Sequence, residues 1–269
     1  MSSSYEAKNF TLWHLENEIT NFDQFYLHNH TDKMEILVMH EGDAEFHIEG
    51  NVYPLEPNDI IIVQHNELHR VVMRSLCHYN RTVININQSF FTENKCEYFK
   101  KVFVDRTLGE QNLIKHNSDE AKELLEIIER LKKYSFVDKP LPIIVENTLI
   151  ELLYILNTNE IKPEESFGNK NNIRNIILYI NDHITQPLDL EYIASRFFMS
   201  KYHLCHIFKK HTGVTVNQYI TRKRIAIVKE LYDQGKSLTY ASSEAGFKSY
   251  SSFYRAYLKE SGMSPKVKP

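Results

Sequence analysis

The sequence is poor in residues that mark several protein classes. Its 269 residues include 3 Cys, 8 Gly and 8 Pro. So little Gly and Pro excludes a collagen-like or low-complexity chain, and no apolar run approaches the roughly 18 residues of a membrane-spanning helix. Residues 1–10 also lack the apolar stretch of a secretory signal, so we expect a cytoplasmic protein with no membrane partner. Cys77, Cys96 and Cys205 are irregularly spaced and odd in number, which predicts free thiols.

Charge is divided unequally along the chain. Hydrophobic residues make up 42% and charged residues 25%, as in an ordinary globular protein. Residues 1–170 carry 17 Lys and Arg against 28 Asp and Glu, whereas residues 171–269 carry 15 against 7. An acidic part joined to a basic part is the asymmetry expected when the basic part binds a polyanion. A basic helical face can also be merely solvated, so charge alone does not decide.

The first half of the chain has the pattern of short strands separated by turns. The expected strands cover residues 35–40, 44–48, 52–55, 59–63 and 82–86. Turn-forming Gly, Pro, Asn and Asp residues separate the first four, which favours closely spaced antiparallel hairpins. We therefore predict a small antiparallel β-barrel or sandwich.

Two helices are predicted to follow the strands. An apolar stripe from Ala121 to Leu131 has helical spacing, and Pro142 can occupy the first turn of a second helix whose apolar face runs to Leu156. These helices could cover the barrel or form a subunit interface, and the sequence leaves both readings open.

The remainder of the chain is predicted to be helical. Residues 157–170 are polar and aperiodic, which is typical of a linker. The expected N-caps are Asn172, Asp189, Ser200, Thr215, Ser237 and Ser249, and the expected stops are Pro187, Gly213, Gly235, Gly246 and Gly262. We therefore predict an α+β multidomain protein with a first domain over residues 1–160, a linker over 161–170 and an all-α domain over 171–269.

An internal repeat connects this tail to a function. Residues 200–213 match residues 249–262, with each matched pair 49 positions apart. Leu204 aligns with Phe253, and Phe208 with Tyr257. A short helix precedes each copy, at residues 193–197 and 241–245. This pattern predicts two helix-turn-helix units, each with a second helix able to enter a major groove of DNA.

The repeat also predicts which side chains contact DNA. The outward positions of the second helices are Lys201, Tyr202, Cys205, His206 and Lys209 in the first unit, and Tyr250, Ser251, Tyr254 and Arg255 in the second. Of these, Arg255 can donate two hydrogen bonds to O6 and N7 of guanine. Recognition of the DNA sequence should therefore depend most on the second unit.

The helix predicted over residues 215–234 connects the two units. It would span roughly 30 Å, near the roughly 34 Å between successive major grooves on one face of a duplex. Arg222, Lys223, Arg224 and Lys229 on this helix are candidates for phosphate contacts. An equally weighted alternative is that Arg224 only ties the units together.

At these positions the tail resembles the AraC/XylS family of bacterial transcription regulators. The matching segments are MSKYHLCHIFKKHTG at residues 199–213 and GFKSYSSFYRAYLKESGMSP at residues 246–265. The resemblance implies a DNA-binding unit with two recognition helices, joined to a domain that senses an effector or dimerises. It also implies base or backbone contacts at Tyr202, Cys205, His206, Ser251 and Arg255.

The first half resembles a cupin, a small barrel often fused to such tails. His28, His30, Glu35 and Gly42 match its first motif. The second motif is degraded, with Asn58, Gln64 and Asn66 at positions usually held by Gly, Pro and Gly, but His69 falls at the expected place. In regulators with this barrel the resemblance implies an effector pocket at His28, His30, Glu35 and His69, to which we assign no metal and no cofactor. A purely structural polar core is the other metal-free reading.

The expected function is a sequence-specific transcription regulator, modulated by a small-molecule effector in the barrel. Its expected partners are double-stranded DNA, a second copy of the chain in a homodimer and, if it is an activator, RNA polymerase. The alternative is a metal-dependent cupin oxygenase or isomerase, because three His and one carboxylate suit a divalent transition metal. The sequence has no phosphate-cradling loop, nucleophile elbow or His-Glu-x-x-His helix, so we assign no catalytic residue.

Overall fold

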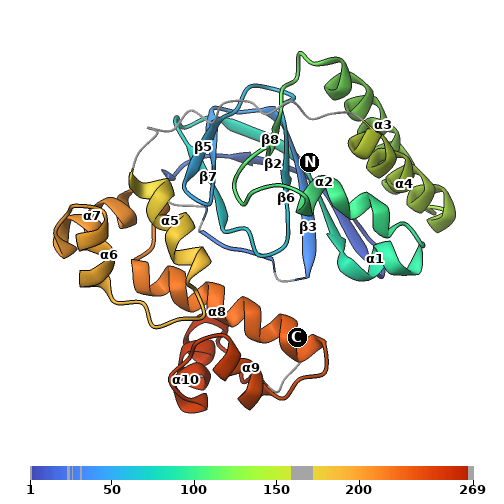
Figure 1. Ribbon diagram of the computed structural model, residues 1–269. Coiled ribbons are helices and arrows are strands. Elements are labelled where there is room, and N and C mark those ends of the chain that lie inside the picture. Colours follow the sequence, from blue (N-terminus) through green and yellow to red (C-terminus); the bar gives the residue numbers. More distant parts are fainter. Residues whose placement is uncertain (1, 23–24, 26, 31, 159–171, 266–269) are drawn as a thin grey trace. The chain divides into compact units, whose positions relative to one another are not determined.

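The computed structural model describes residues 2–22, 25, 27–30, 32–158 and 172–265. The chain divides into two compact units, Met1–Gly168 and Asn169–Pro269 (Figure 1). The predicted linker at residues 161–170 lies outside the described residues, so the predicted domain boundaries remain a prediction.

Two antiparallel sheets form the first unit. The six-stranded sheet has the order β1 (Ser3–Glu6), β2 (Phe10–Glu18), β8 (His78–Asn87), β3 (Lys33–Glu41), β6 (Ile60–Val63) and β9 (Leu113–Ile114). The three-stranded sheet has the order β5 (Asn51–Pro54), β4 (Ala44–Ile48) and β7 (His69–Met73). This arrangement confirms the predicted antiparallel β domain.

Alternating side chains give the six-stranded sheet two different buried faces. On β8, Ile84 and Ile86 belong to a core formed with helices, whereas Val83 belongs to a core that also contains Phe46 and Met73 of the three-stranded sheet. We call the face that carries Val83 the inner face. Since side chains alternate along a strand, Asn85 also lies on it.

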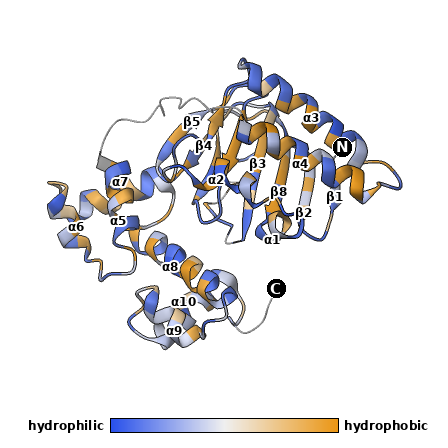
Figure 2. Cartoon of the chain, turned by 45° about the vertical axis from the view of Figure 1, so that its right-hand side comes forward, coloured by the Kyte–Doolittle hydropathy of each residue, from blue (hydrophilic) through white to orange (hydrophobic). Residues whose placement is uncertain are grey.

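Two helices cover the outer face of the six-stranded sheet. These are α3 (Asp119–Ser135) and α4 (Pro142–Thr158), which lie side by side in Figure 1 and bury apolar residues in the same core as Ile84. The Ser118 hydroxyl accepts a hydrogen bond from the Ala121 amide at 3.0 Å, which caps α3. Apolar residues form a stripe on α3 but extend along most of α4 (Figure 2).

The predicted strands were incomplete. β1, β2, β7 and β9 were missed, as were α1 (Gln88–Glu93), η2 (Glu97–Lys100) and α2 (Lys101–Val104). β8 begins at His78 rather than at 82, and β5 ends at Pro54 rather than at 55. β2 was missed because residues 10–18 mix Trp, His and Glu with few turn residues beside them, so pairing with β8 across the sheet decides the structure there.

The second unit consists of helices. They are α5 (Asn172–Asp182), α6 (Leu190–Arg196), α7 (Lys201–Thr212), α8 (Val216–Asp233), α9 (Leu238–Glu244) and α10 (Tyr250–Ser261). The side chains of Asp189, Ser200, Thr215, Ser237 and Ser249 cap the helices that follow them, as predicted. The side chain of Asn172 lies outside the described residues.

Glycines end the second helix of each repeat, as the sequence predicts. Gly213 and Gly262 adopt left-handed conformations with φ of 82° and 71° at the C-caps of α7 and α10. Gly246 is also left-handed, with φ of 85°, and in addition a Cβ there would lie 2.5 Å from the carbonyl oxygen of Thr185.

The three cysteines are free thiols, as predicted. Among the described helices, none combines the length and apolar character that a membrane crossing requires.

Candidate functional sites

The helix pair α6 and α7 forms the first helix-turn-helix unit. Leu204 and Phe208 are fully buried and hold α7 against the domain. The opposite side of α7 is open, with Tyr202 82% exposed and Lys201, His206 and Lys209 also exposed. Cys205 is half-buried. The structure therefore places the predicted contact residues of this unit on one accessible helix face.

The helices α9 and α10 form the second unit in the same way. Phe253 is fully buried behind α10, while Ser251 and Arg255 are exposed. The Arg255 Nε atom donates to the carbonyl of Ser251 at 3.4 Å. Tyr254 and Tyr250 are half-buried, and the Tyr250 ring lies 5.9 Å from that of Phe253. Tyr250 thus packs partly against the core of this unit.

Most of the candidate phosphate contacts on α8 are engaged within the protein. Arg224 donates to the carbonyls of Ile184 and Gln186 at 2.8 and 2.7 Å, and Arg222 pairs with Glu260 at 2.8 Å. Lys223 is buried. The bonds of Arg224 attach α8 to the segment between α5 and α6, which favours the alternative that Arg224 ties parts of this domain together.

The four residues of the cupin-like motif meet at one end of the barrel. Glu35 comes from β3 and His69 from β7, while His28 and His30 come from the segment before β3. Backbone hydrogen bonds in both directions between His28 and His69, at 3.0 and 2.9 Å, fix this segment to β7. One ligand atom from each of the four side chains lies within 4.8 Å of the others.

The electrostatics of this cluster depend on burial and on close partners. Burial would raise the pKa of Glu35, but the 3.0 Å hydrogen bond with His30 and the nearby His69 and His28 lower it to about 2. Burial lowers the pKa of His69 to about 4, although Glu35 opposes this. Glu35 is therefore ionised and His69 neutral near pH 7.

Hydrogen bonding defines which nitrogen of His69 faces the cluster. The Nδ1 atom lies 2.8 Å from the carbonyl oxygen of Glu67, which can only accept, so Nδ1 carries the proton. The Nε2 atom is buried, makes no hydrogen bond among the described residues, and lies 3.8 Å from Glu35. A neutral His69 thus presents the Nε2 lone pair to the cluster.

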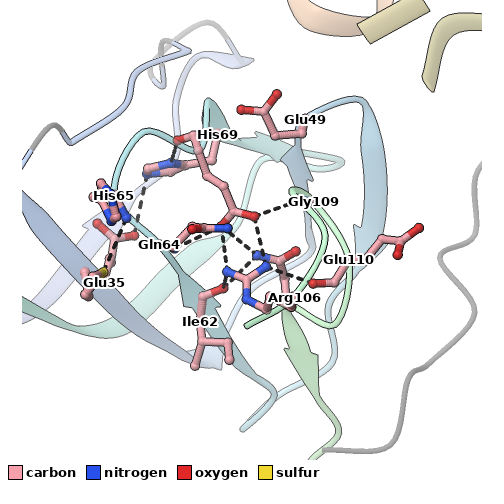
Figure 3. Close-up of polar contacts among 12 residues, drawn as sticks. Glu35, Glu49, Ile62, Gln64, His65, His69, Arg106, Gly109 and Glu110 are labelled. Carbon is pink, nitrogen blue, oxygen red and sulfur yellow. Dashed lines mark hydrogen bonds and ion pairs between the residues drawn. The ribbon is translucent and has the colours of Figure 1, made fainter. Parts of the chain in front are cut away.

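Sequence reasoning missed a buried ion pair beside the cluster. Arg106 donates to both carboxylate oxygens of Glu67, at 2.9 and 2.7 Å, and the amides of Gly109 and Gln64 donate to the same carboxylate at 2.7 and 2.9 Å. Figure 3 shows Arg106, Gly109 and Gln64 gathered around these contacts, close to His69. Glu67 therefore links the loop before β9 to the segment that orients His69.

Sequence reasoning also missed polar residues of the inner face. Strand register places Asn85 of β8 directly between Glu35 of β3 and Thr11 of β2. Among the described residues, Oδ1 of Asn85 and Oγ1 of Thr11 are buried without a hydrogen-bond partner. Alternation within residues 82–86 was the available signal, because it places Asn85 on the face opposite Ile84 and Ile86.

The cluster has a donor set that suits a divalent transition metal. Three imidazoles and a carboxylate are its usual protein ligands, and the carbonyl that fixes the Nδ1 proton of His69 is the outer support such ligands commonly have. A second group, Glu56, Asp59 and His116, is also close. In this second group the Lys115 ammonium pairs with Asp59 at 3.0 Å, so the carboxylate already has a cationic partner within the chain.

A barrel joined to a duplicated helix-turn-helix defines a class of two-domain transcription regulators, and comparison with known proteins agrees. Residues 193–267 match the family model of a helix-turn-helix domain, and residues 20–138 match that of an AraC-like ligand binding domain. The chain belongs to the AraC family of transcription regulators.

Individual relatives cover different parts of the chain. The multiple antibiotic resistance protein MarA of Escherichia coli is 35% identical over 86 residues, which are 32% of this chain and 68% of MarA. The uncharacterized HTH-type transcriptional regulator YdiP of E. coli is 23% identical over 88% of this chain and 78% of its own. The solved structure of ToxT from Vibrio cholerae aligns over 96% of this chain and 97% of its own, at 16% identity and a TM-score of 0.41.

Proposed function

We propose that this regulator reads duplex DNA through the exposed faces of α7 and α10. The supporting observation is the duplicated unit, in which each second helix is held from behind by buried residues and leaves the opposite face open. The proposed contacts are Lys201, Tyr202, Cys205, His206, Lys209, Tyr250, Ser251, Tyr254 and Arg255. Because duplex DNA is the proposed partner, the proposed location is the cytoplasm.

The proposed effector site is the cluster of His28, His30, Glu35 and His69, extended by Asn85. Buried polar atoms without partners are rare, so those of His69, Asn85 and Thr11 favour a polar ligand here. A bound effector can regulate DNA binding only if it binds two states of the protein with different affinity.

A homodimer is proposed through the outer side of α4. Ile143, Ile144 and Tyr154 are 60%, 42% and 51% exposed on this helix, whose other side packs on the sheet. Exposed large apolar side chains on one helix favour a protein contact. Sedimentation analysis tests this: Ile143→Glu should yield monomers where the parent chain is dimeric, and a dimer that survives the change refutes this interface. If the protein activates transcription, RNA polymerase is a further partner.

Selection of bound duplexes from a random pool tests the DNA-binding proposal. We expect two half-sites about one helical turn apart, with an affinity that falls steeply as salt rises, because Lys and Arg displace counterions from phosphates. Recovery of no preferred sequence contradicts the proposal.

A metal-dependent enzyme is the second candidate, favoured by the Nε2 lone pair of His69 facing the other donors. A bound metal would be held by His28, His30, Glu35 and His69 and would act as a Lewis acid. Elemental analysis of protein purified without chelators separates the candidates: stoichiometric metal supports this one, and its absence supports a metal-free effector pocket.

A further inference from the structure

The two recognition helices present different chemistry to DNA. The α10 face carries Arg255, which suits guanine. The whole of α7, residues 201–212, contains no Arg, Asn, Gln, Asp or Glu. The side chains that most often read a base through two hydrogen bonds are therefore missing from α7, apart from Lys.

The lysines of α7 are poorly placed for reading bases. Lys201 pairs with Glu191 of α6, with its Nζ atom 3.2 Å from a carboxylate oxygen. Lys209 and Lys210 lie in the last turn of α7, whereas the N-terminal part of a recognition helix enters the groove. The central positions that remain are Tyr202, Cys205 and His206.

These central positions form a mainly apolar surface. Tyr202 is 82% exposed, and its ring lies nearly parallel to that of His206, with 6.4 Å between centroids and 13° between planes. Cys205 lies between these two residues in the sequence. It is half-buried and behaves as a small apolar side chain. The ring pair spans one helical turn on the outward face.

Only one group on a base edge in the major groove is apolar, the 5-methyl group of thymine. We propose that α7 recognises thymine methyl groups through Tyr202 and Cys205, so that the first half-site is specified by apolar contact and the second by the pairing of Arg255 with guanine. This inference rests on the proposed function.

Deoxyuridine tests the inference because it differs from thymidine only by the missing methyl group. The probe is the duplex selected from the random pool, with each thymine replaced in turn by uracil. The half-site of α10 is the one at which Arg255→Ala relaxes base preference, and the other belongs to α7. Affinity is measured by fluorescence anisotropy at one fixed salt concentration.

We expect at least one replacement in the α7 half-site to weaken binding about fourfold, the effect of losing one buried methyl group. In Tyr202→Ala that replacement should have little further effect, because its partner has already been removed. Tyr192→Ala is the matched control, since Tyr192 is an exposed tyrosine on α6, and it should retain the full sensitivity.

The failures are distinguishable. If no preferred duplex is selected, the proposed function itself fails. If a preferred duplex is selected but no uracil in the α7 half-site weakens binding, or the sensitivity persists in both Tyr202→Ala and Cys205→Ser, the thymine inference is overturned and DNA recognition stands. Circular dichroism of each variant checks that its helices remain folded.

Discussion

At the residue scale, Phe198 is unusual in the turn between α6 and α7. It has a positive φ of 55° and is 99% exposed. A left-handed conformation costs a residue with a Cβ roughly 1–2 kcal/mol. Because the Phe198 ring is exposed, burial does not offset this cost. We predict that Phe198→Gly raises the free energy of unfolding by about 1 kcal/mol, measured by urea denaturation.

Phe198→Ala is the matched control, because it removes the ring but keeps the Cβ. It should unfold at the parent urea concentration. Equal stability of the Gly and Ala variants would mean that the backbone of this turn is not strained. A gain in stability accompanied by a loss of DNA affinity would assign the exposed ring to binding.

Arg255 and Lys209 should affect DNA binding in different ways. Arg255→Ala should weaken binding to the selected duplex by about 1–3 kcal/mol and relax the preference at one base pair, because it removes a two-bond contact with guanine. Lys209→Ala should weaken all sequences nearly alike and lower the salt slope by about one, as a phosphate contact does. Titrations of selected and random duplexes at several salt concentrations measure both, and equal losses on both duplexes for Arg255→Ala would place Arg255 on the phosphate backbone.

At the element scale, Glu67 joins the loop between β6 and β7 to the loop before β9. Its fully buried carboxylate accepts from Arg106, Gly109, Gln64 and Asn112. Glu67→Gln keeps the shape but leaves the Arg106 charge buried without its counter-ion, so we predict a loss of about 3 kcal/mol in unfolding free energy. Glu123→Gln, an exposed change on α3, should stay within about 0.5 kcal/mol of the parent. Denaturation followed through Trp13, the single tryptophan and a residue of β2, measures this unit, and a Glu67→Gln loss no larger than that of the control would contradict the prediction.

Elements with a local signal were predictable, and those fixed by distant partners were not. Ser200, Ser249, Gly213 and Gly262 mark the ends of α7 and α10 through hydrogen bonds and backbone conformations that each residue makes locally. β2 owes its structure to pairing with β8, whose paired residues lie 60 or more positions away in the sequence.

The same distinction holds for the candidate sites. His28, His30, Glu35 and His69 were predictable because their spacing follows a known motif, and the structure brings them together. The pairing of Glu67 with Arg106 was not, because it joins two loops that no periodicity connects. Arg222 and Arg224 were ambiguous, since an Arg on a helix can face phosphate or a neighbouring carbonyl, and only tertiary packing decides.

At the scale of the whole molecule, pH should control the stability of the first unit through buried histidines. Burial is the first cause lowering the pKa of His69, to about 4, and also lowers those of His14 and His40. The unfolded chain then binds more protons than the folded one at pH values below the usual histidine pKa of about 6.5. Stability from these groups is complete above that pH and is lost as the pH falls toward 4. The raised pKa of His78 acts in the opposite direction, but this group lies in solvent.

Further acidification should lower the stability again through Glu35. Because the pKa of Glu35 is lowered to about 2, the stabilisation from its ionised form is lost as the pH falls through 4.5 and below. We predict that His69→Gln flattens the stability profile between pH 6.5 and 4, by at most about 1.4 kcal/mol for each pH unit. His203→Gln, at an exposed position on α7, is the control and should leave the profile of this unit unchanged. Urea denaturation followed by Trp13 fluorescence at several pH values gives the profile. If His69→Gln shows the parent slope, His69 does not titrate in the folded barrel differently from the unfolded chain, and the neutral form that presents Nε2 to the cluster loses its physical basis.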